Sequence, residues 1–138
     1  MKYIGLDLGS RTCGIAISDA LGMLARTYDT LRFDDDDYEF AANKVIEICK
    51  SEGVLNVILG LPKHMNGDLG IRAQISENFK NMIESKSNSK VELVDERLTT
   101  KIVDRTMISG NLRREKRKEK KDELAAVVIL QNYLDRKF

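Results

Sequence analysis

Short runs of apolar residues, alternating with polar or small ones, fill the first quarter of the chain. The runs Lys2 to Leu8 and Cys13 to Ser18 are rich in residues that favour strands, and Gly9 to Thr12 joins them. A connection this short is typical of antiparallel neighbours. Leu24 to Leu31 follows as a weaker third strand. The pattern therefore predicts an opening antiparallel meander of three strands.

The pattern then changes to helices that alternate with buried strands. A helical spacing ends near Ser51, and the apolar run Val54 to Leu61 is typical of a strand buried on both faces. Leu69 to Glu84 again has apolar residues at helical spacing, and a strand from Val91 to Glu96 follows it. These βαβ units predict two parallel strands after the meander.

Two further helices are expected towards the carboxyl end. Thr99 or Thr100 can cap a helix that Gly110 ends, and the last helix is expected to begin at Asp122. The basic segment between them, Arg113 to Lys121, is expected to form a loop. The whole order, β-β-β-α-β-α-β-α-α, predicts an α/β fold with a mixed five-stranded sheet and helices on both faces.

Composition narrows the class of protein. The chain has 138 residues, 42% of them hydrophobic, and no apolar run approaches the ~20 residues that a membrane span needs. We therefore expect one soluble domain over residues 1–138, with no membrane partner and no need for disulfides. Cys13 and Cys49 lack CxxC spacing and are expected to be reduced, buried thiols. No secretory signal precedes the first strand, which predicts a cytoplasmic protein.

Charge is unevenly distributed, although the net charge is only +1. The acidic run Asp34 to Asp37 precedes a helical pattern, where carboxylates cap free amides, so we expect it to be structural. The segment Arg113 to Lys121 carries seven cations and two anions. A solvated loop is the alternative, but its position next to Asp122 favours contact with the phosphates of a nucleic acid.

Three acidic residues stand where expected strands end or the last helix begins. Asp7 lies near the end of the first strand, Glu96 ends the fifth, and Asp122 opens the last helix. Like charges repel unless a cation neutralises them, and Mg²⁺ or Mn²⁺ takes carboxylate oxygens as ligands. A pair of such cations can clamp the attacking and leaving oxygens of a phosphodiester. The three acids therefore predict a metal-dependent nuclease of the two-metal-ion type.

The residues around these acids have alternative interpretations. Gly5 and Gly9 leave room for a phosphate and metals beside Asp7, or they serve only a turn or close packing. Asp95 and Glu96 point to opposite faces of a regular strand, so only one of them can share a site with Asp7. The strand pattern alone does not choose between them.

The role of Asp122 depends on how closely its helix approaches the sheet. Ala125 and Ala126 follow it, and small residues allow a helix to press close and bring the carboxylate within range of a metal. Alanine also simply favours helix formation. The spacing leaves both interpretations open.

Four segments carry a resemblance to a known family. GLDLGSRTCGIAISD, VILGLPKHMNG, VELVDERLTT and DELAAVVILQNYLD resemble, in the same order, the four blocks of the YqgF/RuvX family, over nearly the whole chain. The resemblance implies a ribonuclease H-like fold and a nuclease that trims the 5' leader from precursor 16S rRNA in ribosome biogenesis. An older interpretation of the family is Holliday junction resolvase. The family motifs assign catalytic and metal-binding roles to Asp7, to Glu96 rather than Asp95, and to Asp122.

Phosphate contacts are expected from polar and basic side chains near the three acids. They are Ser10, Arg11, Arg97, Thr99, Arg113, Arg114, Lys116, Arg117, Lys118, Lys120 and Lys121. The expected partner is nucleic acid, either precursor rRNA or branched DNA, with a ribosomal or RNA-processing protein as a further candidate. A junction resolvase is expected to act as a dimer, but no helix is apolar enough to demand a partner, so a monomer or weak dimer is expected.

Two other classes of function fit parts of the sequence. IGLDLGS also resembles the first phosphate loop of actin-like sugar kinases and chaperone ATPases, which enclose nucleotide between two related domains. This chain has the length of one such domain and lacks an evident second phosphate loop. A non-catalytic RNA-binding module that uses the basic segment is the second alternative. Three aligned acids favour the nuclease over both.

Overall fold

A computed structural model describes residues 1–61, 67–95 and 114–137, with the backbone alone described for 67–69, 95 and 114–123. Along these ranges strands come first and helices alternate with the later strands. The elements are β1 (Tyr3–Leu8), β2 (Thr12–Ser18), β3 (Ala25–Arg32), α1 (Tyr38–Glu52), β4 (Asn56–Leu61), α2 (Gly67–Lys86), β5 (Lys90–Asp95) and α4 (Arg114–Lys137).

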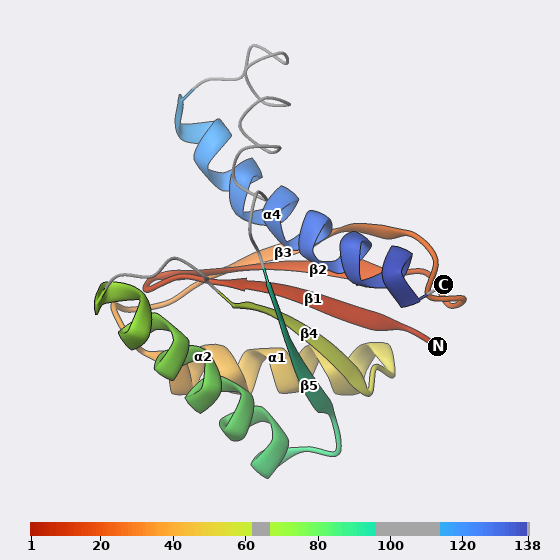
Figure 1. The fold of residues 1–138 in the computed structure, drawn as a ribbon, viewed down its shortest axis with the longest axis horizontal. Coiled ribbons are helices and arrows are strands. Elements are labelled where there is room, and N and C mark those ends of the chain that lie inside the picture. The colour runs from red at the N-terminus through yellow and green to blue at the C-terminus, as the bar shows by residue number, and fades with distance from the viewer. Residues whose placement is uncertain (62–66, 96–113, 138) are drawn as a thin grey trace.

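The five strands form one mixed sheet in the order β3-β2-β1-β4-β5. β1 pairs with β2 and β2 with β3 in antiparallel fashion, whereas β4 runs parallel to β1 and β5 parallel to β4. The sheet confirms the predicted fold class of three antiparallel strands followed by two parallel ones. Figure 1 shows α1 and α2 on one face of this sheet and α4 on the other, so helices cover both faces as expected.

Alternation along β1 divides its side chains between two cores. Ile4 and Leu6 are fully buried in the larger core, which contains residues of α1 and α2. Tyr3 lies on the opposite face, in a smaller core with Ile58 of β4 and Leu130 of α4. Asp7, which has the same parity as Tyr3 and Gly5, therefore belongs to the face that α4 covers.

Helix α4 approaches the central strand closely at Gly5. A Cβ atom at this position would lie 2.6 Å from Leu130 Cβ, nearer than real Cβ atoms come, and 3.0 Å from the Ala126 carbonyl oxygen, which is also a tight contact. Ala125 and Ala126 are both buried here. The expectation that small residues let this helix press against the sheet is confirmed for the described part of α4.

One expectation about the last helix is wrong. The basic segment does not form a loop up to Asp122, because α4 already begins at Arg114 and includes the run as far as Lys121. Arginine, lysine and glutamate are good helix formers, and this stretch contains no glycine or proline to end a helix. The expected helix capped by Thr99 or Thr100 lies outside the described residues.

Two smaller expectations are confirmed. Asp37 caps α1, because its carboxylate accepts a hydrogen bond from the Phe40 amide at 3.3 Å, so the acidic run has a structural role. Cys13 and Cys49 are buried free thiols. Burial raises the pKa of the Cys49 thiol, which keeps the group neutral in the folded protein.

Replacement of Gly5 by alanine should destabilise the fold by about 1–3 kcal/mol, because the added methyl group must displace backbone atoms of α4. Urea unfolding followed by circular dichroism measures this change. Gly70→Ala is the matched control: a Cβ atom at Gly70 meets no atom within 4 Å, so alanine should leave stability unchanged or raise it by up to about 1 kcal/mol. Equal stability of both variants would contradict the close packing of α4.

Candidate active site

The parallel strands β1, β4 and β5 end at the same edge of the sheet. Leu6 of β1 is level with Leu59 of β4, and Leu61 of β4 is level with Asp95 of β5. Binding sites of α/β proteins form preferentially at the carboxyl ends of parallel strands. Asp7 lies at this edge, one residue beyond Leu6, so the candidate site is built around it.

Glycines surround Asp7 on three strands. Gly5 precedes it by two residues on the same face of β1, and Gly14 of β2 is its direct partner across the antiparallel pair. On the other side of β1, Leu6 is level with Leu59 of β4. The next residue of β4, Gly60, therefore corresponds in position to Asp7. Gly14 and Gly60 place no side chain beside this partly buried carboxylate, whereas Leu130 and the Ala126 carbonyl oxygen fill the space at Gly5.

Helix α4 runs antiparallel to β1 across this face. The rings of Tyr3 and Tyr133 lie 5.8 Å apart, and Gly5 meets Leu130 and Ala126. From Gly5 to Asp7, β1 advances by about 7 Å. Because α4 rises by about 1.5 Å per residue, the same distance corresponds to four or five residues towards the amino end of α4. The backbone therefore brings Asp7 about level with the turn of α4 that contains Asp122.

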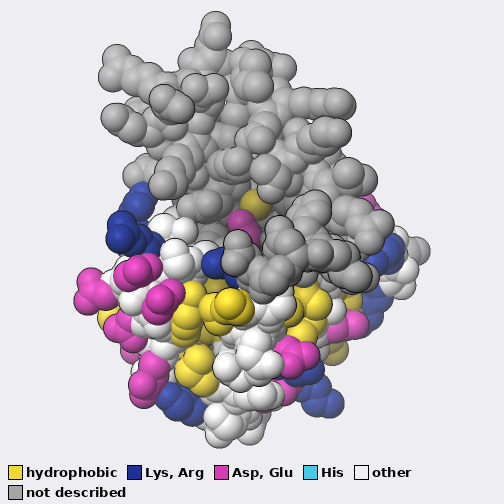
Figure 2. Space-filling model, turned by 60° about the vertical axis from the view of Figure 1, so that its left-hand side comes forward, with side chains coloured by type: hydrophobic (Ala, Val, Ile, Leu, Met, Phe, Trp, Pro, Cys, Tyr) yellow, Lys and Arg dark blue, Asp and Glu magenta, His cyan; other side chains and the backbone are white. Residues whose placement is uncertain are grey.

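The turn between β1 and β2 presents Ser10 and Arg11 next to Asp7, and the acidic run packs against it. The Asp36 amide donates to the Ser10 carbonyl oxygen at 2.9 Å, and the Phe33 amide donates to the Arg11 carbonyl oxygen at 3.0 Å. The Arg11 guanidinium, 75% exposed, lies 3.6 Å from the Asp35 carboxylate. Figure 2 brings this end of the sheet forward and shows acidic side chains close together beside basic ones. Arg11 is thus available to an anion, although an exposed acid competes for it.

Arg72 is a residue of this edge that the sequence analysis missed. It lies on α2, and its Nη2 donates to the Leu8 carbonyl oxygen at 3.1 Å, at the end of β1. Tyr38 lies nearby: burial and the Asp36 carboxylate raise the pKa of its hydroxyl, while the charge of Arg72 opposes this shift. A lone arginine on an amphipathic helix carries no sequence signal of its own, so only the tertiary contact identifies it.

The other predicted site residues fall partly or wholly outside the described residues. Glu96, Arg97, Thr99 and Arg113 lie outside them. The helical backbone is described, but not the side chain, for the remaining positions: Arg114, Lys116, Arg117, Lys118, Lys120, Lys121 and Asp122. Within the described ranges no three acidic, histidine or cysteine side chains form a group able to hold a metal. The convergence of Asp7, Glu96 and Asp122 therefore stays a prediction.

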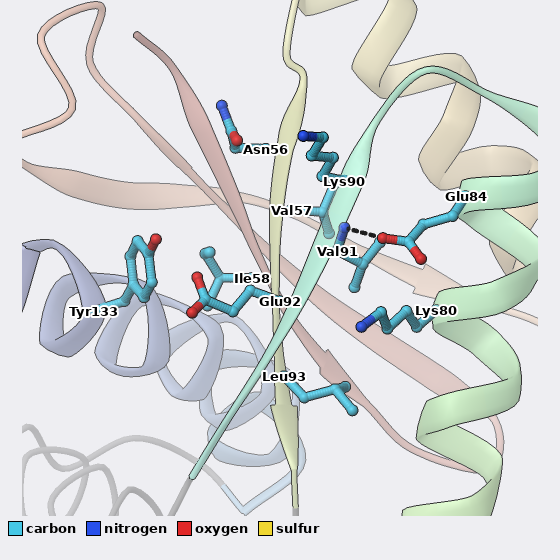
Figure 3. A pocket seen from close by; sticks show the side chains of 10 residues that line it. All are labelled: Asn56, Val57, Ile58, Lys80, Glu84, Lys90, Val91, Glu92, Leu93 and Tyr133. Atoms are coloured by element: carbon cyan, nitrogen blue, oxygen red, sulfur yellow. Dashed lines mark hydrogen bonds between the residues drawn. The ribbon is translucent and has the colours of Figure 1, made fainter.

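A cavity of about 520 Å³ lies beside β5, away from Asp7 (Figure 3). Its acids lie on opposite sides of the strand: Glu92 points towards Tyr133, whereas Glu84 comes from α2 and accepts a hydrogen bond from the Val91 amide at 2.9 Å. Burial and the Glu92 carboxylate raise the pKa of Tyr133. Because Glu84 is engaged by the strand and Glu92 by the phenol, this cavity does not offer a set of converging metal ligands.

Comparison with known proteins gives relatives along the whole chain. The RuvX family, described as Holliday junction resolvase, matches residues 1–136. A protein of Oceanobacillus iheyensis named "Putative pre-16S rRNA nuclease" is 44% identical over 137 residues, which cover 99% of this chain and 100% of the relative. A protein of Listeria monocytogenes with the same name is 45% identical and covers 98% of both chains.

Solved structures show the same fold at low sequence identity. The chain resembles Thermus thermophilus RuvC in complex with a Holliday junction substrate, with a TM-score of 0.63 and 13% identity over 99% of this chain and 95% of the other. It also resembles a Fowlpox virus resolvase bound to Holliday junction DNA, with a TM-score of 0.59 and 15% identity over 100% and 99% of the two chains. The ribonuclease H-like fold expected from the sequence is confirmed. None of the helices in the described ranges has the length and apolar character needed to cross a membrane.

Proposed function

Because this chain belongs to the RuvX family, we propose that it is a metal-dependent nuclease that hydrolyses phosphodiester bonds at the 5' end of precursor 16S rRNA. The observation that carries this proposal is the identity of 44% to a full-length relative named for that activity. The proposal covers residues 1–138 as a single nuclease domain, working in the cytoplasm where the rRNA precursor is made.

The surroundings of Asp7 fit a divalent cation. A carboxylate is a hard oxygen ligand, and Gly14 and Gly60 place no side chain beside it on the neighbouring strands. We propose that Asp7, Glu96 and Asp122 hold Mg²⁺ or Mn²⁺ in a two-cation site. Such ions, when bound, supply charge neutralisation at the phosphate and a lowered pKa of the attacking water.

The alternation of β5 favours Glu96 over Asp95 as the partner of Asp7. Leu93 packs against the core of α1 and α2, whereas Val94 is buried in the core of α4. Position 95 shares the parity of Leu93 rather than that of Val94, so the backbone of β5 does not favour Asp95 as the partner of Asp7. This physical argument agrees with the assignment that the family motif implies.

The basic segment supports binding of the substrate better as a helix than as a loop. Arg114, Arg117, Lys118 and Lys121 recur at i, i+3, i+4 and i+7, so these positions share one side of α4. We propose that these cations, with Ser10 and Arg11, contact phosphates close to the carboxylates.

Cleavage of branched DNA is the second candidate function. The family description and the likeness of the fold to two junction resolvases favour it. Phosphodiester hydrolysis uses the same carboxylates in either case, so the two functions differ in how the substrate is held. A resolvase would need two sites across a symmetric junction, and hence a dimer, whereas trimming of a leader needs only one.

Asp7→Asn should abolish metal-dependent cleavage, with a loss of at least about 100-fold in rate, because it removes a metal-binding charge at nearly constant size. Folding should persist, which circular dichroism checks. Calorimetric titration with Mn²⁺ gives a readout independent of cleavage and should show weakened binding. Asp29→Asn, an equal change on the exposed strand β3, is the control and should retain both properties. Full cleavage by Asp7→Asn would exclude the proposed role.

A direct comparison of substrates tests the proposed reaction. With Mn²⁺, the protein should cut precursor 16S rRNA at the 5' leader faster than it cuts a four-way DNA junction, and a chelator should stop cleavage. Gel analysis of the product ends measures both. Faster cutting of the junction would establish the second candidate function. Binding of RNA that is insensitive to chelator, without any cleavage, would show a non-catalytic module instead.

Asp35→Asn should strengthen nucleic-acid binding modestly, by about two- to fivefold at low salt, because it removes the acid that competes for Arg11. The gain should disappear at high salt, where exposed charges are screened. Fluorescence anisotropy with labelled RNA measures the affinity. Glu47→Gln, which removes an equal charge from α1, is the control and should leave the affinity for RNA unchanged. An equal gain in affinity in this control would show that net charge alone causes the effect.

A further inference from the structure

The central strands β1 and β4 separate at the candidate site. Their pairing ends at Leu6 and Leu59, whereas β1 continues to pair with β2 as far as Leu8. The Gly9 amide donates to the Thr12 carbonyl oxygen at 2.7 Å, so Gly9 directs its backbone groups towards β2. By antiparallel alternation Leu8 directs its carbonyl group the other way, into the gap that β4 leaves.

Arg72 fills this gap. Its Nη2 donates to the Leu8 carbonyl oxygen at 3.1 Å, and its side chain is partly buried. A guanidinium carries five N–H donors, and this bond uses one of them. Within the described part of the chain the group forms no ion pair with a carboxylate. The gap therefore holds a positive charge whose one described partner is neutral.

Two acids that act on Tyr38 together with Arg72 are already engaged. The Asp36 carboxylate accepts a hydrogen bond from the Tyr38 hydroxyl at 3.0 Å, and the Asp35 carboxylate lies 3.6 Å from Arg11. Both acids influence the pKa of Tyr38 together with Arg72, so they share its surroundings without neutralising it by contact. A partly buried charge that meets only neutral groups is costly, so a guanidinium whose described contact is a carbonyl oxygen gains from an anion that enters the gap.

The position of Arg72 indicates which anion this is. Leu8, its partner, directly follows Asp7, so the guanidinium lies at the strand end that carries the proposed metal-binding carboxylate. The planar fork of N–H groups matches two phosphate oxygens at once, which a lysine cannot do. A nucleic-acid strand that crosses this edge of the sheet would bring successive phosphates to Asp7 and to Arg72.

We propose that Arg72 is a positioning residue that binds the phosphate next to the scissile one, and so sets the register of the nucleic-acid strand on the carboxylates. This inference rests on the proposed nuclease function. It adds a specific anchor from α2, on the face of the sheet opposite α4, to the contacts expected from the basic helix. RNA and DNA backbones share this phosphate chemistry, so both serve as probes.

Binding measured as a function of salt tests the proposal. Labelled precursor-leader RNA and a labelled DNA junction are titrated with protein in EDTA, so cleavage does not interfere, over a range of KCl concentrations. Each phosphate contact contributes about −0.7 on single strands, or −0.9 on duplex DNA, to the slope of log affinity against log salt. Arg72→Gln should flatten the slope by one such step and weaken binding about tenfold at low salt.

Two variants separate this role from a structural one. Arg72→Lys keeps the charge and should keep the wild-type slope, with part of the affinity lost because the fork is gone. Lys80→Gln removes an equal charge further along α2 and should change neither slope nor affinity. In cleavage assays Arg72→Gln should raise KM and also lower kcat, because a strand out of register places the scissile phosphate away from the carboxylates.

The salt slope tests the phosphate contact of Arg72, whereas cleavage tests the nuclease function. An unchanged salt slope in Arg72→Gln, with affinity lost only in proportion to the free energy of unfolding, would show that Arg72 merely joins α2 to β1. The proposal would then be wrong. A one-phosphate change of slope in a protein that cuts neither substrate would remove the nuclease function and leave the phosphate contact established.

Discussion

Contact between α4 and the central strand β1 at Gly5 sets the geometry of one whole face of the sheet. Leu130 and the Ala126 carbonyl oxygen occupy the space that any side chain at this position would need. The helix is therefore held at a distance that only glycine and alanine permit, and it crosses the sheet with its first turns towards the strand ends. Because Asp7 lies two residues beyond Gly5, the same packing determines how far the start of α4 lies from the carboxylate.

The opposite face contributes to the same edge by a different route. There the larger core fixes α1 and α2 against β1 and β4, and α2 supplies Arg72 to the gap in which these strands separate. The two faces thus bring opposite charges to one strand end, with carboxylate on the side of α4 and guanidinium from the side of α2. This arrangement suits a phosphodiester, which needs cations around its oxygens and ligands for the metal that activates water.

The acidic and the basic segments of the chain have different roles in the structure. The acidic run between β3 and α1 is used for caps and turns, since Asp37 caps α1 and the Asp36 amide bonds to the turn that holds Ser10. The basic run belongs to the start of α4, where helical periodicity places four of its basic positions along one side. The net charge of this protein is only +1, and the acidic run next to the proposed nucleic-acid site serves structural roles.

Local patterns in the sequence determined the elements, because alternation and helical spacing report which side of each segment is buried. They gave the meander, the parallel strands and the structural role of Asp37 correctly, and the four family-like blocks identified the fold. The start of α4 escaped them, since a highly charged run without glycine or proline suits both a solvated loop and a helix. Arg72 and the close contact at Gly5 were decided by tertiary structure alone. Each depends on a partner more than sixty residues away, and no local spacing records which distant backbone atom a side chain or a glycine will meet.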